Sequence, residues 1–311
     1  MNICSMANIL VTGGAGFIGS HLVSRLVKDG HEVTVMDTLL RGNKLDKDVF
    51  RNIQFLEEDV RNQDAVFSAA KNCDAIFHLA AVLGVDIVAD NPVETMEVET
   101  IGTRNIAKAA LRHDIPKILY ASTSGIYGHS AMEQAVVEEV MVDPRTSYAM
   151  AKRYNEIYLA ALNEEKGINT ISLRFFNVYG PKQDNRMVIP RFIEQAKAGN
   201  PITVFGDGKQ TRDFTYIDDT TEACIRLMEK SNGAQIFNIA NEKEGCIEEL
   251  AATIKQMTQS NSEIKYLEAP TKRYDYEVGR RVGSSEKLKN AVGYKPDTTL
   301  AQGLDRIINQ G

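Results

Sequence analysis

The sequence lacks several features that would place a chain in a special class at once. No run of about 18 uninterrupted apolar residues occurs among its 311 residues, so we do not expect a transmembrane helix. Positive charge is not in excess, because 36 Lys and Arg stand against 42 Asp and Glu, a net charge of −6, and no basic block occurs. Nucleic acid and anionic membranes are therefore poor candidates for a partner.

Cysteine is also scarce, and its spacing predicts neither a metal site nor a disulfide scaffold. The four cysteines are far apart, with no CxxC pair and no Cys/His ligand spacing (Cys4, Cys73, Cys224 and Cys246). Free thiols are typical of a reducing compartment. The first residues lack the charged region and the cleavage pattern of a signal peptide, so we expect a cytoplasmic protein. Its composition, 43% hydrophobic and 25% charged, is that of a globular chain.

Short apolar runs alternate with amphipathic helical stretches along the first 175 residues. Strands are predicted at residues 8–12, 33–37, 53–57, 75–80, 117–122 and 170–175, and helices at 17–29, about 91–113 and about 146–166. Nearly continuous apolar strands between helices indicate an α/β fold with a parallel sheet covered on both faces. We therefore expect a doubly wound domain at 1–175. Residues 176–311 are expected to form mainly a smaller mixed α/β region, with some segments returning to the main sheet.

Three glycines span the junction where the first predicted strand runs into the first predicted helix. Gly13 permits a tight turn, Gly16 lets the backbone approach a pyrophosphate, and Gly19 allows close packing of helix on strand. In this context the GxxGxxG spacing predicts a Rossmann-type dinucleotide site. Asp37, 18 residues after Gly19, suits the ribose hydroxyls and repels a 2′-phosphate, which favours NAD over NADP. Arg41 lies near enough in sequence to keep NADP open.

Tyr148 and Lys152 are four residues apart, so on a helix they share one face. A tyrosine with its ordinary pKa of about 10 is a poor base. A nearby ammonium lowers that pKa, and the pair can then exchange a proton with an alcohol near neutral pH. Thr123 follows a predicted strand at its carboxyl end, where ligands of doubly wound sheets bind, so its hydroxyl can hold the substrate oxygen. From spacing alone, a plain surface Tyr/Lys pair is the alternative.

Motifs of one kind follow in order along essentially the whole chain. They are Gly13-x-x-Gly16-x-x-Gly19, Asp37, Asp59-Val60, His78-Leu79-Ala80-Ala81, residues 121–128 (ASTSGIYG), Tyr148-x-x-x-Lys152, residues 174–181 (RFFNVYGP) and residues 205–219 (FGDGKQTRDFTYIDD). In this set and order the sequence resembles the extended short-chain dehydrogenase/reductase family of NAD-dependent nucleotide-sugar epimerases and dehydratases.

The resemblance implies roles for individual residues and NAD as the cofactor. Tyr148 would be the catalytic base, Lys152 would tune it and bind the nicotinamide ribose, and Thr123 would be the catalytic hydroxyl. Besides Tyr148 and Lys152, the implied cofactor-binding residues are Gly13, Gly16, Phe17, Ile18, Gly19, Asp37, Asp59, Val60, Leu79, Ala80 and Ala81.

The same resemblance implies a clamp for the nucleotide part of the substrate. Asn177 would bind the diphosphate, Arg212 would neutralise it, and Val188 and Gln210 would touch the nucleoside. Arg273 would make a second diphosphate contact, although its surroundings depart from the family's common Arg-Pro-Gly-Asp.

The run Thr123-Ser124-Gly125 favours one branch of the family chemistry. Dehydratases carry an Asp-Glu pair after the catalytic Thr and decarboxylases of UDP-uronic acids a Thr-Ser-Glu run, and a second proton transfer needs such a base. A 4-epimerase of the UDP-glucose/UDP-galactose type, or a related UDP-sugar epimerase, needs no further acid or base. UDP-uronate decarboxylase and 4,6-dehydratase stay open as alternatives, and a non-catalytic dinucleotide sensor as a remote one. The helices predicted at 91–113 and 146–166 resemble those of a dimer interface in this family, so we expect a homodimer.

Overall fold

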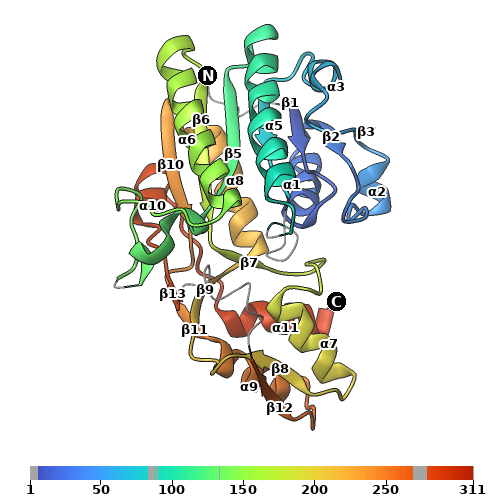
Figure 1. Cartoon of the computed structure of the whole chain (residues 1–311). Coiled ribbons are helices and arrows are strands. Elements are labelled where there is room, and N and C mark those ends of the chain that lie inside the picture. Colours follow the sequence, from blue (N-terminus) through green and yellow to red (C-terminus); the bar gives the residue numbers. More distant parts are fainter. Residues whose placement is uncertain (1–5, 83–87, 89, 133, 269–278, 311) are drawn as a thin grey trace.

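A seven-stranded parallel sheet forms the centre of the computed structural model, which describes residues 6–82, 88, 90–132, 134–268 and 279–310 (Figure 1). In spatial order its strands are β10 (Ala234–Ile239), β6 (Asn169–Phe175), β5 (Lys117–Thr123), β4 (Ala75–His78), β1 (Asn8–Thr12), β2 (Glu32–Asp37) and β3 (Gln54–Glu57). The strand order reverses between β1 and β4. Ligands of doubly wound sheets bind at the carboxyl ends of the strands beside such a reversal.

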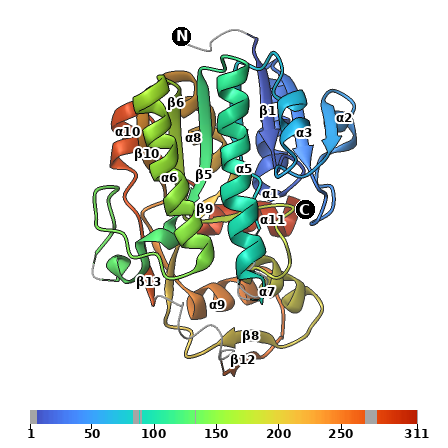
Figure 2. The same cartoon turned by 45° about the horizontal axis from the view of Figure 1, so that its top comes forward.

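The two faces of the sheet are covered by different helices because the side chains of each strand alternate. Ile9 and Val11 of β1 pack in one cluster with α1 (Phe17–Lys28) and α8 (Ile217–Lys230). Leu10 packs in the other cluster, with α3 (Gln63–Ala69), α5 (Pro92–Arg112) and α6 (Ser147–Lys166). Figure 2 shows α5 and α6 side by side across the second face. Both faces of the sheet are therefore buried, as the continuous apolar strands predicted.

All six strands expected from the sequence are present, with ends that agree with the prediction or differ from it by at most two residues. The largest difference is at β4, which ends at His78 rather than at residue 80. The chain turns there across the end of β1, where the N–H of Leu79 donates to the carbonyl of Thr12. The seventh strand, β10, comes from the carboxyl-terminal half of the chain and pairs with β6.

A second group of elements lies below the main sheet in Figure 1. It contains the sheet β11 (Glu244–Cys246), β9 (Thr211–Tyr216) and β13 (Arg280–Arg281), with β7 (Asn177–Tyr179) also paired to β9. Beside it are the pair β8 (Ile202–Phe205) and β12 (Ile264–Leu267) and the helices α7 (Val188–Lys197), α9 (Ile247–Met257) and α11 (Leu300–Gln310). The short helices α2 (Lys47–Phe50), η1 (Ser124–Ala131) and α10 (Glu286–Val292) complete the fold. One apolar cluster runs from α1 and α8 into this second group.

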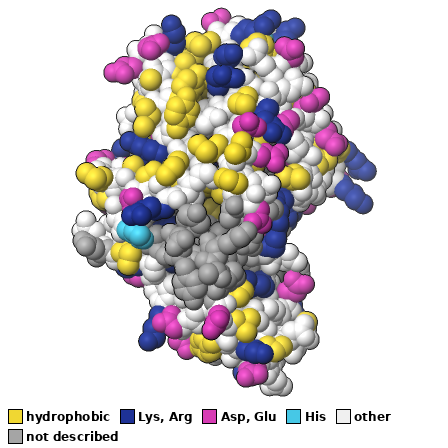
Figure 3. Space-filling model, viewed as in Figure 1, with side chains coloured by type: hydrophobic (Ala, Val, Ile, Leu, Met, Phe, Trp, Pro, Cys, Tyr) yellow, Lys and Arg dark blue, Asp and Glu magenta, His cyan; other side chains and the backbone are white. Residues whose placement is uncertain are grey.

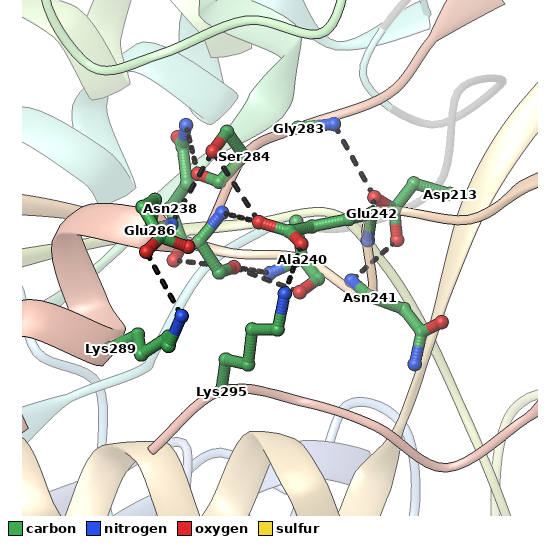
Figure 4. A network of polar contacts seen from close by, with 11 residues as sticks. Asp213, Asn238, Ala240, Asn241, Glu242, Gly283, Ser284, Glu286, Lys289 and Lys295 are labelled. Carbon is green, nitrogen blue, oxygen red and sulfur yellow. Dashed lines mark hydrogen bonds and ion pairs between the residues drawn. The ribbon is translucent and has the colours of Figure 1, made fainter. Parts of the chain in front are cut away.

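Asp213 of β9 links the second sheet to the segments that follow β10 and β13 (Figure 4). Its carboxylate accepts hydrogen bonds from the backbone N–H groups of Asn241 (2.8 Å), Glu242 (2.9 Å) and Gly283 (3.3 Å). Glu242 in turn forms an ion pair with Lys295 at 2.6 Å. One buried carboxylate thus joins three stretches that are distant in sequence.

Three of the four cysteines lie in the described part of the chain and are free thiols. Cys73 and Cys224 are buried, and Cys246 is half-buried. Burial raises the pKa of Cys73 to about 11 and that of Cys224 to about 12. Cys4 lies outside the described residues. Among the described helices, none combines the length and the apolar character that a membrane span requires. The described side chains also contain no group of three His, Cys, Asp or Glu residues placed to hold a metal.

Candidate active site

The turn after β1 lies directly against the chain that leaves β4. Gly13 has a φ of +70°, which glycine adopts without strain. A Cβ on Gly13 would lie 2.7 Å from the backbone nitrogen of Ala80. That nitrogen donates to the hydroxyl of Thr12 at 3.3 Å. The structure therefore brings Gly13 together with Leu79, Ala80 and the adjoining Ala81, four residues predicted to bind the cofactor.

The helix α1 begins immediately after this turn, with Gly16 as its N-cap residue. A Cβ on Gly19 would lie 2.1 Å from the carbonyl oxygen of Gly13, so only glycine allows the helix to pack this closely. No side chain caps the start of this described helix, which leaves its first backbone N–H groups able to hold an anion. Phe17 and Ile18, the first two helical residues, are partly buried against the core. This cradle fits the pyrophosphate of a dinucleotide.

Asp37 ends β2 beside the glycine turn. Its carboxylate accepts hydrogen bonds from the N–H groups of Ala15 (3.0 Å) and Leu39 (2.9 Å). Burial raises the pKa of Asp37, and the backbone N–H groups of Leu39, Ala15 and Gly16 oppose this rise. Each carboxylate oxygen can accept more than one hydrogen bond, so Asp37 keeps acceptor capacity for ribose hydroxyls.

Asp59 and Val60 follow β3, at the same edge of the sheet. Arg61 holds the Asp59 carboxylate through its Nε and Nη2 atoms, the shortest contact being 2.6 Å. Burial raises the pKa of Asp59, but the hydrogen bonds and charge of Arg61 outweigh burial and lower that pKa. Val60 is buried, and a Cβ on Gly102 would meet its side chain at 2.7 Å. A contact of this pair with adenine stays a prediction.

The predicted catalytic pair occupies the first two turns of α6, beside the end of β5. Thr146 caps this helix by accepting a hydrogen bond from the N–H of Ala149 at 3.0 Å. The buried ammonium of Lys152 donates to the carbonyl of Ala121 on β5 at 2.7 Å. It lies 5.4 Å from the centroid of the Tyr148 ring. The i, i+4 pair is therefore not a plain surface pair, because its lysine is buried against the sheet.

Thr123 is the last residue of β5, two positions after the carbonyl that Lys152 contacts. Its Oγ1 accepts a hydrogen bond from the N–H of Gly125 at 3.1 Å, which starts the turn η1. The hydroxyl hydrogen of Thr123 can still be donated to another acceptor. Both α6 and η1 pack at this end of β5, so Thr123, Tyr148 and Lys152 lie at one edge of the sheet.

Glu99 on α5 belongs to the same cluster, and our sequence analysis missed it. Its Oε2 atom lies 3.0 Å from the Nζ of Lys152, and both side chains are almost fully buried. The expectation that Lys152 lowers the pKa of Tyr148 is not met, because burial, and then the charge of Glu99, raise that pKa well above its usual range. Glu99 lies on the buried face of α5, together with Thr95, Gly102 and Thr103. A carboxylate on such a face was the signal in the sequence, because glutamate is seldom buried without a partner.

Two of the three residues predicted to hold the diphosphate, Asn177 and Arg212, lie on one face of the small sheet. Asn177 of β7 pairs in register with Phe214 of β9, two residues after Arg212, so Asn177 and Arg212 point to the same face. Arg281 of β13 pairs in register with Arg212 and shares that face. Arg281 was not predicted from the sequence, although the two consecutive arginines Arg280-Arg281 were a visible signal. Two arginines paired in register on one face favour an anion there, although Nη1 of Arg212 also donates to the carbonyl of Thr211 at 2.8 Å.

The remaining predicted substrate residues are placed less directly. Val188 is the first residue of α7 and is partly buried against the core. Gln210 precedes β9, and its side-chain amide donates to the carbonyl of Phe205 at 3.1 Å. Arg273 lies outside the described residues.

Comparison with known proteins gives one consistent family. A family model described as the NAD dependent epimerase/dehydratase family matches residues 9–240. The UDP-N-acetyl-alpha-D-glucosaminuronate decarboxylase of Bacillus cytotoxicus is 37% identical over 310 residues, which cover 96% of each protein. A putative UDP-glucose 4-epimerase of Methanocaldococcus jannaschii is 34% identical over 97% of each protein. The crystal structure of UDP-glucose 4-epimerase from Thermotoga maritima, with UDP-glucose, aligns at a TM-score of 0.91 and 31% identity over 97% of each chain.

Proposed function

This chain belongs to the NAD-dependent epimerase/dehydratase family, and from that premise we propose that it epimerises a nucleotide sugar at C4. The expected substrates are UDP-glucose and UDP-galactose or a related pair of UDP-sugars. NAD is the cofactor of the family, as the glycine turn and Asp37 predicted. Its nicotinamide, when bound, accepts a hydride from C4 and later returns it.

The chain's own residues would move and hold the proton of the 4-hydroxyl group. Tyr148 takes this proton while the sugar is oxidised to the 4-keto form, and returns it when the sugar is reduced. Thr123 holds the same oxygen through its hydroxyl. The ammonium of Lys152 lies 5.4 Å from the centroid of the Tyr148 ring and would hold the phenol in place. Their common position at the end of β5 supports these roles.

The observation that carries the choice of epimerase is the segment after Thr123. Ser124 is buried and Gly125 lies within the turn η1, whose eight residues include no carboxylate. Dehydration needs a base that removes a second proton, and that base is absent from this segment. Epimerisation needs only the first oxidation, a turn of the keto sugar and reduction on its opposite face.

Decarboxylation of a UDP-uronate is the second candidate, and one observation favours it. The relative from Bacillus cytotoxicus carries the name of such a decarboxylase and is 37% identical to this chain. A 4-keto acid loses carbon dioxide with modest assistance, so a missing carboxylate after Ser124 disfavours this reaction less than it disfavours dehydration.

The diphosphate of the substrate would bind to the shared face of the small sheet. Arg212 and Arg281 supply two guanidinium groups there, and Asn177 adds an amide. These groups suit phosphate oxygens, because charged hydrogen bonds from arginine are strong and often bidentate. Val188, Gln210 and Arg273 keep their predicted substrate roles in this proposal.

We also propose that the protein works as a homodimer through α5 and α6. These helices expose Met96, Met150, Tyr154 and Ile157. A groove between them is lined by Met96, Met150, Tyr154 and Tyr158 among others. Figure 3 shows hydrophobic side chains gathered over this face. A contiguous apolar surface of this kind is typical of a protein interface.

The reaction is tested by incubating the purified protein with UDP-glucose, UDP-galactose, UDP-glucuronate and UDP-N-acetylglucosaminuronate in D₂O, without added NADH. An epimerase converts one C4 isomer to the other and keeps hydrogen at C4, because the same hydride returns. A decarboxylase releases carbon dioxide and takes deuterium from solvent at the carbon that lost the carboxylate. Proton NMR separates the two results. Inactivity on this panel and on dTDP-, GDP- and CDP-sugars would refute the proposed function.

A further inference from the structure

The buried carboxylate of Glu99 contacts the lysine of the proposed catalytic pair. Oε2 of Glu99 is 3.0 Å from Nζ of Lys152, and the two side chains are exposed by 0% and 1%. The same carboxylate oxygen is 3.4 Å from the hydroxyl of Tyr120 on β5. Asn155 donates from its side chain to the backbone carbonyl of Glu99 and to the Tyr120 hydroxyl. Glu99 is therefore fixed by α6 and β5 as well as by its own helix.

The surroundings of this pair differ from those of a buried ion pair held for stability alone. The second oxygen, Oε1 of Glu99, has no hydrogen bond of normal geometry among the described residues; burial raises the pKa of Glu99, and besides Lys152 and Tyr120 the backbone N–H of Val82 opposes that rise. Buried ion pairs stabilise a fold only when their remaining lone pairs are satisfied, because desolvation of the charges is costly. An incompletely satisfied carboxylate beside a proposed catalytic lysine calls for an electrostatic explanation.

The charge balance gives that explanation. A lysine ammonium beside a phenol normally stabilises the phenolate. Here the Lys152 ammonium already faces the Glu99 carboxylate. The two opposite charges therefore largely cancel in their effect on a third group such as the phenol of Tyr148. Burial and the Glu99 charge both raise the pKa of Tyr148. Removal of Glu99 would leave Lys152 as an uncompensated positive charge that attracts the phenolate.

The other ionisable groups around the cluster do not replace Glu99. His78 on β4 is buried, and burial lowers its pKa to about 3, so it is neutral. Burial also raises the pKa of Tyr120 well above its usual range, so this phenol stays protonated. One turn farther along α6, Glu156 is paired with Arg174 of β6 at 2.9 Å. Within the part of the chain that the structure describes, Glu99 is thus the carboxylate that faces Lys152 directly.

We infer that Glu99 is a positioning residue that holds and neutralises Lys152, and that it thereby sets how firmly Tyr148 keeps its proton. The inference rests on the proposed roles of Tyr148 and Lys152, which it deepens. Its consequence is that Tyr148 remains a protonated phenol in the resting protein and becomes a base only when further positive charge enters the site.

The inference is tested by titrating Tyr148 itself, which requires no turnover. The full chain is labelled with 3-fluorotyrosine, whose phenol is more acidic, and the Tyr148 resonance is identified by its loss in Tyr148→Phe. Glu99→Gln is expected to lower the pKa of this phenol by about one to two pH units, the effect of one unit charge roughly 6–12 Å away at an effective dielectric constant near 20. Glu97→Gln, an exposed change of the same charge on the same helix, is the matched control and should leave the titration unchanged.

Two further variants keep the inference testable if Glu99→Gln folds poorly. Lys152→Met should raise the phenol pKa, because Glu99 is then uncompensated. Adding Glu99→Gln to Lys152→Met should lower it again, close to that of the unmodified protein, since both charges are gone. A Tyr148 titration that does not respond to Glu99→Gln in either background overturns the inference. The outcome is independent of the proposed reaction, because an inactive protein with these shifts supports the inference and refutes only the reaction.

Discussion

Arg174 and Glu156 form a buried, bidentate ion pair. Nε of Arg174 lies 2.9 Å from Oε1 of Glu156, and the second nitrogen–oxygen contact is also 2.9 Å. Ser122 of β5 donates to the same carboxylate at 2.6 Å. The remaining guanidinium nitrogen reaches the hydroxyl of Tyr127 in η1 at 2.8 Å. The pair therefore ties β5, β6, α6 and η1 together immediately behind Thr123 and Lys152.

We expect Arg174→Met to destabilise the protein by about 3–5 kcal/mol, because it leaves a buried carboxylate without its main partner. Enzymatic activity measured at low urea concentration should fall as well, because Arg174 no longer connects η1 to α6. Equilibrium urea unfolding measures the change in stability. Arg153→Met is the control, because Arg153 also contacts Glu156, at 2.9 Å, but is about one-third exposed. Partly exposed ion pairs contribute at most about 1 kcal/mol, and an equal loss in both variants would contradict this account.

The proposed diphosphate clamp predicts an effect on substrate affinity. Arg212→Met and Arg281→Met should each raise KM about 10- to 100-fold, since a hydrogen bond to a charged group contributes about 1.5–3 kcal/mol. Steady-state kinetics with the active nucleotide sugar measures this change, and kcat should fall much less.

Arg280→Met is the matched control for that clamp. Arg280 precedes Arg281 in β13 but pairs with Glu244 at 2.9 Å, on the other face of the strand. Its loss should leave KM nearly unchanged. A larger rise of KM in Arg280→Met than in Arg281→Met would show that the diphosphate binds elsewhere.

The local geometry of the candidate cofactor site could be predicted from the sequence because its residues are close together along the chain. The turn that contains Gly13, Gly16 and Gly19 is a local structure, and Asp37 closes the strand that follows the first helix. Tyr148 and Lys152 needed only the period of one helix. In each case a short-range rule was sufficient.

The residues that the sequence analysis missed are brought in by tertiary packing. Glu99 is 53 positions before Lys152, and which faces of α5 and α6 meet depends on their crossing over the sheet. Arg281 reaches Arg212 through a strand of two residues whose register no local pattern specifies. β10 joins the main sheet after an excursion of more than fifty residues from β6, which hydrophobic periodicity cannot predict.

Asp213 predicts a pH dependence of stability. Burial raises its pKa to about 6 from the ordinary value of 3.8, even though three backbone N–H groups oppose the rise. The folded state therefore binds the proton more tightly than the unfolded state. Its contribution to stability is fully present below about pH 4 and is lost as the pH rises through 6, by up to about 3 kcal/mol.

Asp213→Asn separates this pH effect from the hydrogen bonds themselves. The amide cannot accept from all the N–H groups that face it, so we expect a loss of about 1–3 kcal/mol at every pH. The slope of unfolding free energy between pH 4 and pH 6.5 should become flatter than in the unmodified protein. Urea unfolding at several pH values measures both quantities, and an unchanged slope would assign the pH dependence to other groups.

The α5–α6 face predicts the assembly of the protein. Tyr154 and Ile157 lie on α6 and are exposed by 54% and 56%, which is unusual for large apolar side chains on a helix that otherwise packs well. In a twofold dimer the same face would meet its own copy, and the exposed stripe would become the centre of a four-helix contact. A charge placed there would be buried without a partner in both copies.

Ile157→Glu and Tyr154→Glu should therefore convert a dimer into a monomer, with the mass measured by sedimentation equilibrium or light scattering over a range of concentrations. Met141→Glu adds the same charge at a more exposed apolar side chain outside these helices and should leave the mass unchanged. The site residues Thr123, Tyr148 and Lys152 all come from one chain, so a monomeric variant that still folds should retain activity in proportion to its stability. A protein that is monomeric at every concentration before any substitution would exclude this interface.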